Sequence, residues 1–355
     1  MFRIIDFNHR EEWDDIVRGF PQYDVYYLSG YQQAFHLHGD GDPILVYYES
    51  DELKGCCVFF LRDISKLEWT NGEIRPGEMY DVVTPYGYGG WIFEGNTEKE
   101  IISVFWKQYV DFMKQQHIVD AFTRWCPWLA NQEVLRGFSG IVDLGMTIHI
   151  NTESEDVIFQ NIKSKDRATI RKAIKNGVEV IHSDNPDLFD DFIRIYNATM
   201  RKDNALEYYY FSSSFYKSIA NDLKGNWQMF YAVWEGKIIA MSIMLMDNNR
   251  IHYHLSGSVL EYRNLNATNL ILYETAKYGA AHGYQLFHLG GGVGSGEDPL
   301  YKFKKSFNKN GDRQFSISKD CFDSTAYNQL VQLRKNNDKG FNESSSFFPL
   351  YRSES

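Results

Sequence analysis

The stretch WQMFYAVWEGKIIAMSIMLMDNNRIHYHLSGS, residues 227–258, gives the clearest indication of the fold. It contains three β-rich runs separated by two polar turns, EGK (235–237) and DNN (247–249), which predicts consecutive antiparallel strands. A helical stretch, ATNLILYETAKYGAAHG (267–283), and another β-rich run, YQLFHLG (284–290), follow. This order predicts a sheet flanked by a helix.

The first half of the chain repeats this order. DPILVYYESDELKGCCVFFL (42–61) predicts a hairpin, and EKEIISVFWKQYVDFMKQQ (98–116) predicts a helix before the β-rich run IVDAFTRW (118–125). Both helical stretches end beside a histidine, His117 and His282, which are 165 residues apart. We therefore expect an α/β (α+β) protein of two similar domains, each a mixed, mainly antiparallel sheet flanked by helices.

The length of 355 residues suits two domains of about 150 residues each. The boundary is expected near GMTIHINTES (145–154), where a β-rich run gives way to the polar start of a helix. This places the first domain at 1–150 and the second at 151–319. The remaining residues, 320–355, are too few to form a domain of their own.

The composition limits the partners. Lys and Arg number 37 against 47 Asp and Glu, a net charge of −10, so the surface as a whole repels DNA and an anion site must be a local patch. No apolar stretch approaches the ~20 residues of a membrane span, which predicts no integral membrane contact. The first residues, MFRIIDFNHREEW, lack an export signal, so we expect a cytoplasmic protein.

The segment from Asp298 to Phe307 is the most informative part of the chain for chemistry. Asp298 followed by Pro299 is a helix-start signal. Leu300, Phe303, Lys304 and Phe307 then follow helical spacing, which aims Lys304 inward and turns Lys305 to the other side. A buried ammonium needs a partner, although a lysine that snorkels to the surface is equally compatible with the pattern.

The glycine-rich stretch LGGGVGSGE (289–297) comes immediately before this helix. Such a loop lets a ligand approach the backbone closely, which makes Gly291 and Gly292 candidate substrate contacts. No GK[ST] follows and no dinucleotide fingerprint is present. A flexible loop is the alternative.

A second candidate is the helical stretch SKDRATIRKAIKNG (164–177). Its residues Arg167, Arg171 and Lys175 recur four apart and form one basic ridge, and residues 163–175 contain six basic residues against one acidic residue. Guanidinium groups on such a ridge suit the phosphate of a nucleotide precursor or of RNA. The alternative is a solvated helix face.

Other catalytic and metal motifs are missing from the sequence. There is no GxSxG and no HExxH motif, and the four cysteines have no CxxC spacing. His252 and His254 alternate as on a strand, but no third ligand is apparent, so structural roles are favoured and no metal is expected.

Three of these stretches together resemble the FemABX family of peptidoglycan-bridge aminoacyltransferases, in its compact form without a coiled-coil arm. They are LYKFKKSFN (300–308), RATIRKAIKNGV (167–178) and the strand-turn-strand region 231–258. The resemblance covers most of residues 150–320 and the first half more faintly. It implies two GNAT-like domains, no metal, and a C-terminal segment, 320–355, that packs back on the first domain.

The resemblance also implies an activity and its residues. Members transfer an amino acid from aminoacyl-tRNA to an amino group of a peptidoglycan precursor, and the family's functional lysine corresponds to Lys304. The neighbouring Lys305 of the same motif is a substrate-binding candidate, as are Arg201 and Tyr253, which are carried over from the family's acceptor-binding groups. Where the family has a charged contact in its first domain, this chain has TPYGYGGW (84–91), with Tyr86 and Tyr88.

Coenzyme A is disfavoured as a donor but is not excluded. GNAT enzymes that use it carry a Q/RxxGxG/A loop before the central helix, and the corresponding stretch RNLNATN (263–269) has Asn266 and Thr268 at the glycine positions. Side chains there obstruct the approach of phosphate oxygens to the backbone. We therefore expect no cofactor.

The sequence thus predicts an acyltransferase that moves an aminoacyl group from aminoacyl-tRNA to an amine of a nucleotide- or lipid-linked envelope precursor. Lys304 is the candidate catalytic residue. One alternative is an acetyl-CoA-dependent GNAT N-acetyltransferase acting on an amino sugar or polysaccharide precursor. The other is a non-catalytic member that binds a glycan or a nucleotide.

Overall fold

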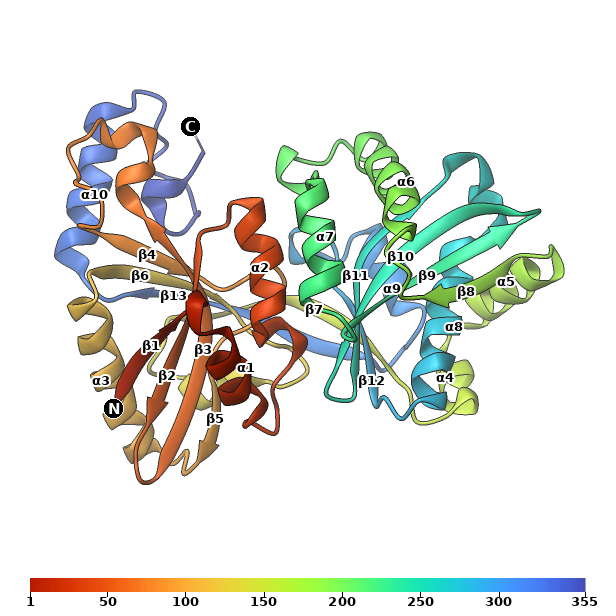
Figure 1. The fold of residues 1–355 in the computed structure, drawn as a ribbon, viewed down its shortest axis with the longest axis horizontal. Coiled ribbons are helices and arrows are strands. Elements are labelled where there is room, and N and C mark those ends of the chain that lie inside the picture. Colours follow the sequence, from red (N-terminus) through yellow and green to blue (C-terminus); the bar gives the residue numbers. More distant parts are fainter. Residues whose placement is uncertain (355) are drawn as a thin grey trace. The chain divides into compact units, whose positions relative to one another are not determined.

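The computed structural model describes residues 1–354 (Figure 1). The chain forms two compact units. Unit 1 contains Met1–Leu144 together with the residues from Phe315 onward, and unit 2 contains Gly145–Gln314. Each unit has its own hydrophobic core.

Unit 1 is built on a mixed sheet. Its strands lie in the order β1 (Phe2–Asp6), β2 (Asp42–Glu49), β3 (Leu53–Asp63), β4 (Tyr80–Val83) and β6 (Ile118–Arg124), with β5 (Ile92–Gly95) paired to β3. The neighbours from β1 to β4 are antiparallel, whereas β4 and β6 are parallel. Parallel neighbours need a crossover connection, and α3 (Lys99–Gln115) lies in the segment that joins them.

Unit 2 repeats this arrangement. Its strands lie in the order β8 (Glu179–Ser183), β9 (Trp227–Trp234), β10 (Lys237–Asp247), β11 (Arg250–Ser258) and β12 (Leu286–Gly290). The neighbours from β8 to β11 are antiparallel, and β11 is parallel to β12 across the helix α8 (Ala267–Ala281). The predicted fold class and the predicted hairpins are confirmed.

Two long strands, β7 (Ile141–Asn151) and β13 (Asp312–Cys321), each cross from one unit into the other. In unit 1, residues 317–321 of β13 pair antiparallel with β6. In unit 2, residues 148–151 of β7 pair antiparallel with β12. The parallel pair of each sheet is therefore continued by one further, antiparallel strand.

The remaining helices surround these sheets. Unit 1 contains α1 (Arg10–Arg18), α2 (Ser29–His38) and α10 (Ser324–Asn337), and unit 2 contains α4 (Glu155–Asn161), α5 (Ser164–Lys175), α6 (Leu188–Lys202), α7 (Ser213–Asp222) and α9 (Pro299–Lys305). Within residues 1–354, every helix is too short or too polar to cross a membrane.

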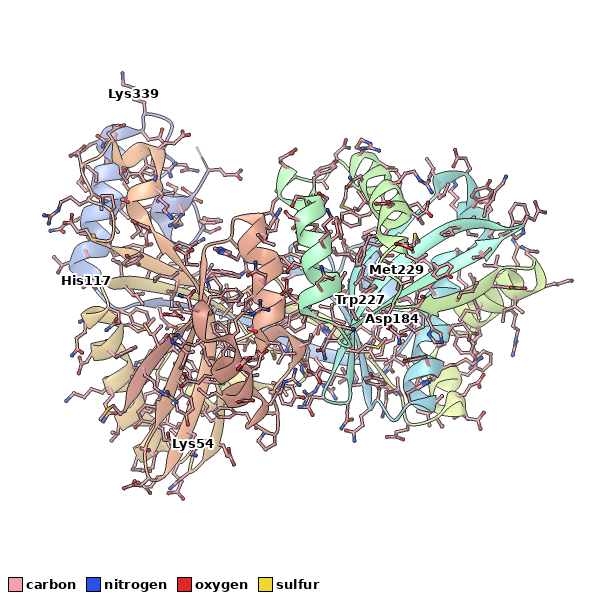
Figure 2. The ribbon with its side chains drawn as sticks, in the orientation of Figure 1. Lys54, His117, Asp184, Trp227, Met229 and Lys339 are labelled. Carbon is pink, nitrogen blue, oxygen red and sulfur yellow. The ribbon has the colours of Figure 1, made fainter. Side chains whose placement is uncertain are left out.

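Aromatic and branched side chains fill both cores. Trp91, Phe105 and Tyr109 are buried in unit 1, where α3 packs on the sheet. In unit 2, α8 packs on its sheet through Ile271, which is fully buried beside Phe287 of β12. Figure 2 labels Trp227 and Met229 of β9, both buried, and Lys54 and Lys339, whose side chains are exposed.

The C-terminal segment packs on the sheet of unit 1. The hydroxyl of Tyr351 donates a 2.6 Å hydrogen bond to Asp120 on β6, and its oxygen also lies 3.1 Å from Oδ2 of Asp81 on β4. Arg352 forms an ion pair with Asp81, and the guanidinium of Arg334 on α10 donates to the carbonyl of Tyr351 at 2.9 Å. The end of the chain is thereby tied to two neighbouring strands.

Candidate functional site

The helix α9 carries the candidate catalytic lysine and begins where the sequence predicts. Asp298 is its N-cap, and Oδ1 of this residue accepts a 2.8 Å hydrogen bond from the backbone N–H of Tyr301. Pro299 occupies the first helical position, where no N–H is needed. This cap fixes the direction in which the seven-residue helix leaves the loop.

The buried face of α9 differs from the predicted stripe. Leu300 is 39% exposed, whereas Tyr301 and Lys304 are each 8% exposed. The physical reason is length: the helix ends at Lys305, so a stripe that needs two full turns cannot form. Tyr301 is buried, and its hydroxyl donates a 2.8 Å hydrogen bond to the carboxylate of Asp312. Phe307 is buried beyond the end of the helix.

Lys304 is buried and its ammonium has a defined partner. Its Nζ donates a 2.7 Å hydrogen bond to the carbonyl of Gly291. Burial lowers the pKa of Lys304 to about 8, and the negative charge of Asp298 acts in the opposite direction. At neutral pH most of the side chain is therefore an ammonium, and two of its three N–H groups are left for other acceptors.

The glycine-rich loop brings Gly291 and Gly292 to the same place. It follows β12 and ends at Asp298, whose Oδ2 accepts a 3.2 Å hydrogen bond from the N–H of Val293. A Cβ atom on Gly292 would lie 2.1 Å from Asp298 Oδ1, so this position requires glycine. Of the predicted residues, Lys304, Gly291 and Gly292 form one local cluster.

A row of buried histidines crosses the strands next to this cluster. His252 of β11 pairs in register with His288 of β12, which pairs with His149 of β7. Burial lowers the pKa of His288 and of His149, and the charge of Lys304 also lowers that of His288. The sequence shows these histidines but not the strand register that aligns them. Among residues 1–354, no three His, Cys, Asp or Glu side chains are grouped so that they could hold a metal.

Lys305 has a partner that the sequence did not predict. Its ammonium forms an ion pair with the carboxylate of Asp312, the residue that also binds the Tyr301 hydroxyl. Lys305 is half-buried, whereas the spacing predicts a residue on the solvated side. Its position beside Asp312 suits a structural contact as well as a substrate contact.

The basic ridge lies on α5 as predicted, with two of its arginines held in place. The guanidinium groups of Arg167 and Arg171 lie 5.6 and 5.1 Å from the ring centre of Phe159 on α4. Arg167 also donates to the hydroxyl of Ser164 at 3.1 Å, and Lys175 is exposed in the last turn. The ridge is thus presented on the surface of unit 2.

Arg201 and Tyr253 lie on other elements of unit 2. Arg201 is exposed in the last turn of α6. Tyr253 is partly buried on β11 beside a bulge, since Met244 of β10 opposes Tyr253 while Ile243 opposes Leu255. Within residues 1–354, no hydrogen bond or ion pair joins either residue to Lys304.

Tyr86 and Tyr88 belong to unit 1 and form part of an aromatic cluster. The ring of Tyr86 is stacked on Phe35, with centroids 5.4 Å apart. Tyr88 meets Trp128 and Phe315 edge-on, at 5.1 and 5.7 Å, and burial raises the pKa of its hydroxyl. These contacts give both tyrosines a packing role.

Comparisons with known proteins agree with this architecture. Residues 162–305 match the acetyltransferase (GNAT) domain family. The crystal structure of FemX is similar with a TM-score of 0.66 at 14% identity, over 94% of this chain and 100% of that chain. The chain has a tandem GNAT-like fold. No curated protein matches it in sequence.

Two further structures share this tandem GNAT-like fold. L-PGS from Bacillus licheniformis has a TM-score of 0.55 at 12% identity, over 92% of this chain and 96% of that chain. The C-terminal domain of a putative lysylphosphatidylglycerol synthetase from Agrobacterium fabrum has a TM-score of 0.53 at 11% identity, over 92% and 94%. The TM-scores show a common fold, and the GNAT-domain match supports an acyltransferase.

The N-terminus of α8 is where a GNAT domain that uses coenzyme A needs room for pyrophosphate, and its residues fit that group poorly. Asn266 precedes the helix with a left-handed backbone (φ 57°), and its side chain donates to the carbonyl of Asn264 at 3.0 Å. In the first turn, Asn269 donates to the carboxylate of Asp166 at 3.3 Å. The first turn of α8 therefore has the carboxylate of Asp166 beside it, and a negative charge at a helix N-terminus opposes the binding of phosphate.

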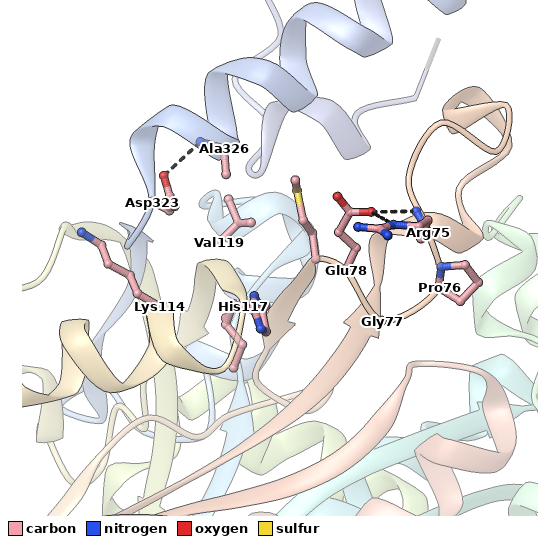
Figure 3. A pocket seen from close by; sticks show the side chains of 11 residues that line it. Arg75, Pro76, Gly77, Glu78, Lys114, His117, Val119, Asp323 and Ala326 are labelled. Carbon is pink, nitrogen blue, oxygen red and sulfur yellow. Dashed lines mark hydrogen bonds and ion pairs between the residues drawn. The ribbon is translucent and has the colours of Figure 1, made fainter.

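Unit 1 contains a separate open pocket of about 590 Å³ (Figure 3). It lies between the loop around Arg75 and Glu78, the end of α3 at Lys114, and the start of α10. Arg75 donates to Glu78 at 3.0 Å, and Asp323 caps α10 by accepting from the N–H of Ala326 at 3.0 Å. None of the predicted site residues lines this pocket, and two of its charged residues, Arg75 and Glu78, pair with each other.

Proposed function

We propose that the protein is an N-acyltransferase that moves an aminoacyl group from aminoacyl-tRNA to an amine of a peptidoglycan-type envelope precursor. The observation that carries this proposal is the buried ammonium of Lys304, which donates a hydrogen bond to the carbonyl of Gly291 in the glycine-rich loop. The resemblance of the FKK motif to the FemABX family and the fold shared with FemX support the same reaction. We place this reaction in the cytoplasm.

The chemistry follows from the needs of ester aminolysis. A neutral amine attacks the ester carbonyl, the new C–N bond forms, and the carbonyl oxygen becomes an oxyanion. The ammonium of Lys304 donates to this oxyanion, a contribution worth about 3 kcal/mol for one well-placed donor. The tetrahedral intermediate then expels the ribose oxygen of the tRNA, which takes up a proton, while the amine releases its proton to the leaving oxygen or to water.

The other candidates supply binding. The ridge of Arg167, Arg171 and Lys175 is assigned to the phosphates of a substrate, because planar guanidinium groups bind phosphate oxygens well. Arg201 and Tyr253 are assigned to the acceptor in unit 2. Tyr86 and Tyr88 of unit 1 are kept as substrate-binding candidates of that unit, beside their packing contacts with other aromatic rings.

The domain match itself favours a second candidate, an acetyl-CoA-dependent N-acetyltransferase. Against it stand the side chains of Asn266 and Asn269 at the start of α8. In the proposed reaction the donor is the aminoacyl ester, and no cofactor takes part.

The experiment is a transfer assay with the purified chain. It offers tRNA charged with radiolabelled amino acids and a UDP-linked muropeptide, with a parallel arm that replaces the charged tRNA by labelled acetyl-CoA. Label that passes to the muropeptide from tRNA and not from acetyl-CoA supports the proposal. Transfer from acetyl-CoA alone supports the second candidate. Stabilisation by the muropeptide or by a free nucleotide without transfer from either donor supports a binding protein.

A further inference from the structure

Asp298 connects the two elements that meet at Lys304. One carboxylate oxygen, Oδ1, accepts from the N–H of Tyr301 in the first turn of α9. The other, Oδ2, accepts from the N–H of Val293 in the glycine-rich loop. The same side chain thus holds the helix that carries Lys304 and the loop that follows Gly291.

The glycines around this carboxylate show how closely the loop is packed. A Cβ on Gly292 would lie 2.1 Å from Asp298 Oδ1 and 2.5 Å from the carbonyl of Gly296. A Cβ on Gly145 would lie 1.7 Å from the carbonyl of Ser295. Neither position tolerates a side chain unless the loop moves, whereas a Cβ on Gly296 would have its nearest contact at 3.7 Å.

We propose that Asp298 is a positioning residue for Lys304, which holds the ammonium and its Gly291 acceptor in one geometry by tying the glycine-rich loop to the first turn of α9. The hydrogen bond from Lys304 Nζ to Gly291 joins these same two elements at 2.7 Å. A displacement of either element by 1 Å would move the ammonium from the position that the oxyanion requires. This inference rests on the role of Lys304 in the proposed function.

Titratable groups on several neighbouring elements surround Lys304. Asp298 contributes a negative charge that raises the pKa of Lys304, while burial lowers it. From the strands, burial keeps His288 and His149 neutral by lowering their pKa values, and His252 lies in register with His288. On the other side of the helix, the charge of Lys305 is balanced by Asp312.

Loss of the Asp298 charge should change the pKa of Lys304 in one direction. Without it the pKa of Lys304 falls further below its ordinary value, so the ammonium loses its proton at a lower pH. A reaction that needs the ammonium then declines at a lower pH than in the wild type. A residue that served only to cap a helix would leave this midpoint unchanged.

The test is the variant Asp298→Asn, because asparagine also caps helices well but carries no charge and offers one acceptor oxygen in place of two. We expect kcat for transfer to fall about tenfold with KM within twofold, and the alkaline limb of the pH profile to move to lower pH. The pH dependence of Lys304 acylation by acetic anhydride, followed by mass spectrometry, should shift in the same direction. This second readout needs no substrate.

Two matched controls separate positioning from folding. Asp323→Asn makes the same change at the N-cap of α10 in unit 1. It should leave unchanged both the midpoint of the alkaline limb for transfer and the midpoint of Lys304 acylation. Gly292→Ala should reproduce the loss of kcat, because its Cβ meets the carboxylate, while Gly296→Ala should retain activity.

Unchanged lysine reactivity and an unchanged pH profile in Asp298→Asn would overturn the inference. If instead Lys304→Met keeps full transfer activity while the reactivity of Lys304 still shifts in Asp298→Asn, the proposed oxyanion role of Lys304 fails and the positioning of Lys304 by Asp298 stands. Absence of transfer by the wild-type protein from either donor, with the same shift of Lys304 reactivity in Asp298→Asn, would refute the proposed function alone.

Discussion

The hydroxyl of Tyr351 donates a 2.6 Å hydrogen bond to Oδ2 of Asp120, which is fully buried. Burial and the nearby charge of Asp81 raise the pKa of Asp120 well above its ordinary value. The folded protein therefore binds this proton more tightly than the unfolded chain does. The end of the chain thus contacts a carboxylate whose ionisation costs stability.

This relationship predicts how stability depends on pH. Between the ordinary aspartate pKa and the raised one, the folded state binds more protons, so the contribution of Asp120 is lost as the pH rises through that window. The variant Asp120→Asn should show a flatter pH dependence of the free energy of unfolding, measured by urea denaturation from pH 4 to pH 8. A variant whose pH dependence equals that of the wild type would contradict this assignment.

The buried ion pair between Arg352 and Asp81 should contribute more to the free energy of unfolding than an exposed ion pair does. The guanidinium of Arg352 is 13% exposed and pairs with the fully buried carboxylate of Asp81, which Arg62 also contacts. Arg352→Ala leaves the buried carboxylate of Asp81 with one cationic partner, Arg62, and should lower the free energy of unfolding by about 3 kcal/mol. Lys335→Ala breaks an exposed pair with Glu343 and should cost about 0.5 kcal/mol or less. Equal effects of the two changes would show that the buried pair does not hold the C-terminal segment.

The basic ridge predicts salt-dependent binding of tRNA. Replacing Arg167, Arg171 and Lys175 together by Ala should lower affinity for tRNA about tenfold or more, measured by fluorescence anisotropy. The dependence of log affinity on log salt should become shallower by about 2, because each lost phosphate contact removes about 0.7 to 0.9 from the slope. Three exposed lysines outside the ridge, Lys99, Lys107 and Lys224, provide the matched control when changed together to Ala. Wild-type affinity and slope in the ridge variant would mean that α5 is a solvated face.

The start of α8 predicts weak binding of coenzyme A. Asn266 and Thr268 stand where a coenzyme A loop has glycines, and the carboxylate of Asp166 binds the Asn269 amide in the first turn of the helix. Titration calorimetry with acetyl-CoA should detect no micromolar affinity. A dissociation constant in the micromolar range would make the acetyl-CoA-dependent enzyme the better account.

Much of the fold could be predicted because its signals are local. The polar turn that contains Gly236 and the alternating runs around it predict the hairpin of β9 and β10 directly. The burial pattern of short helices was harder. The helical spacing of Ile170, Ala173 and Ile174 within residues 164–177 predicts that all three face the core. Ile174 is nevertheless 52% exposed, because the helix ends one residue later and only Ile170 and Ala173 reach the core.

The site was predictable only in part. The sequence indicated that Lys304 faces inward, and it is 8% exposed. Its acceptor, the carbonyl of Gly291, is 13 residues away in the chain and depends on how the loop folds back on Asp298. The alignment of His252 with His288 depends on the register of two strands joined through α8, which periodicity does not determine.

Single-turnover transfer by Lys304→Met measures whether the ammonium of Lys304 stabilises the oxyanion. Methionine keeps the length and the apolar stem but removes the donor, and circular dichroism verifies the fold. The account predicts a rate about a hundredfold or more below wild type. Lys302→Met, an exposed lysine of the same helix, should stay within twofold. A folded Lys304→Met variant that transfers at the wild-type rate would contradict the account.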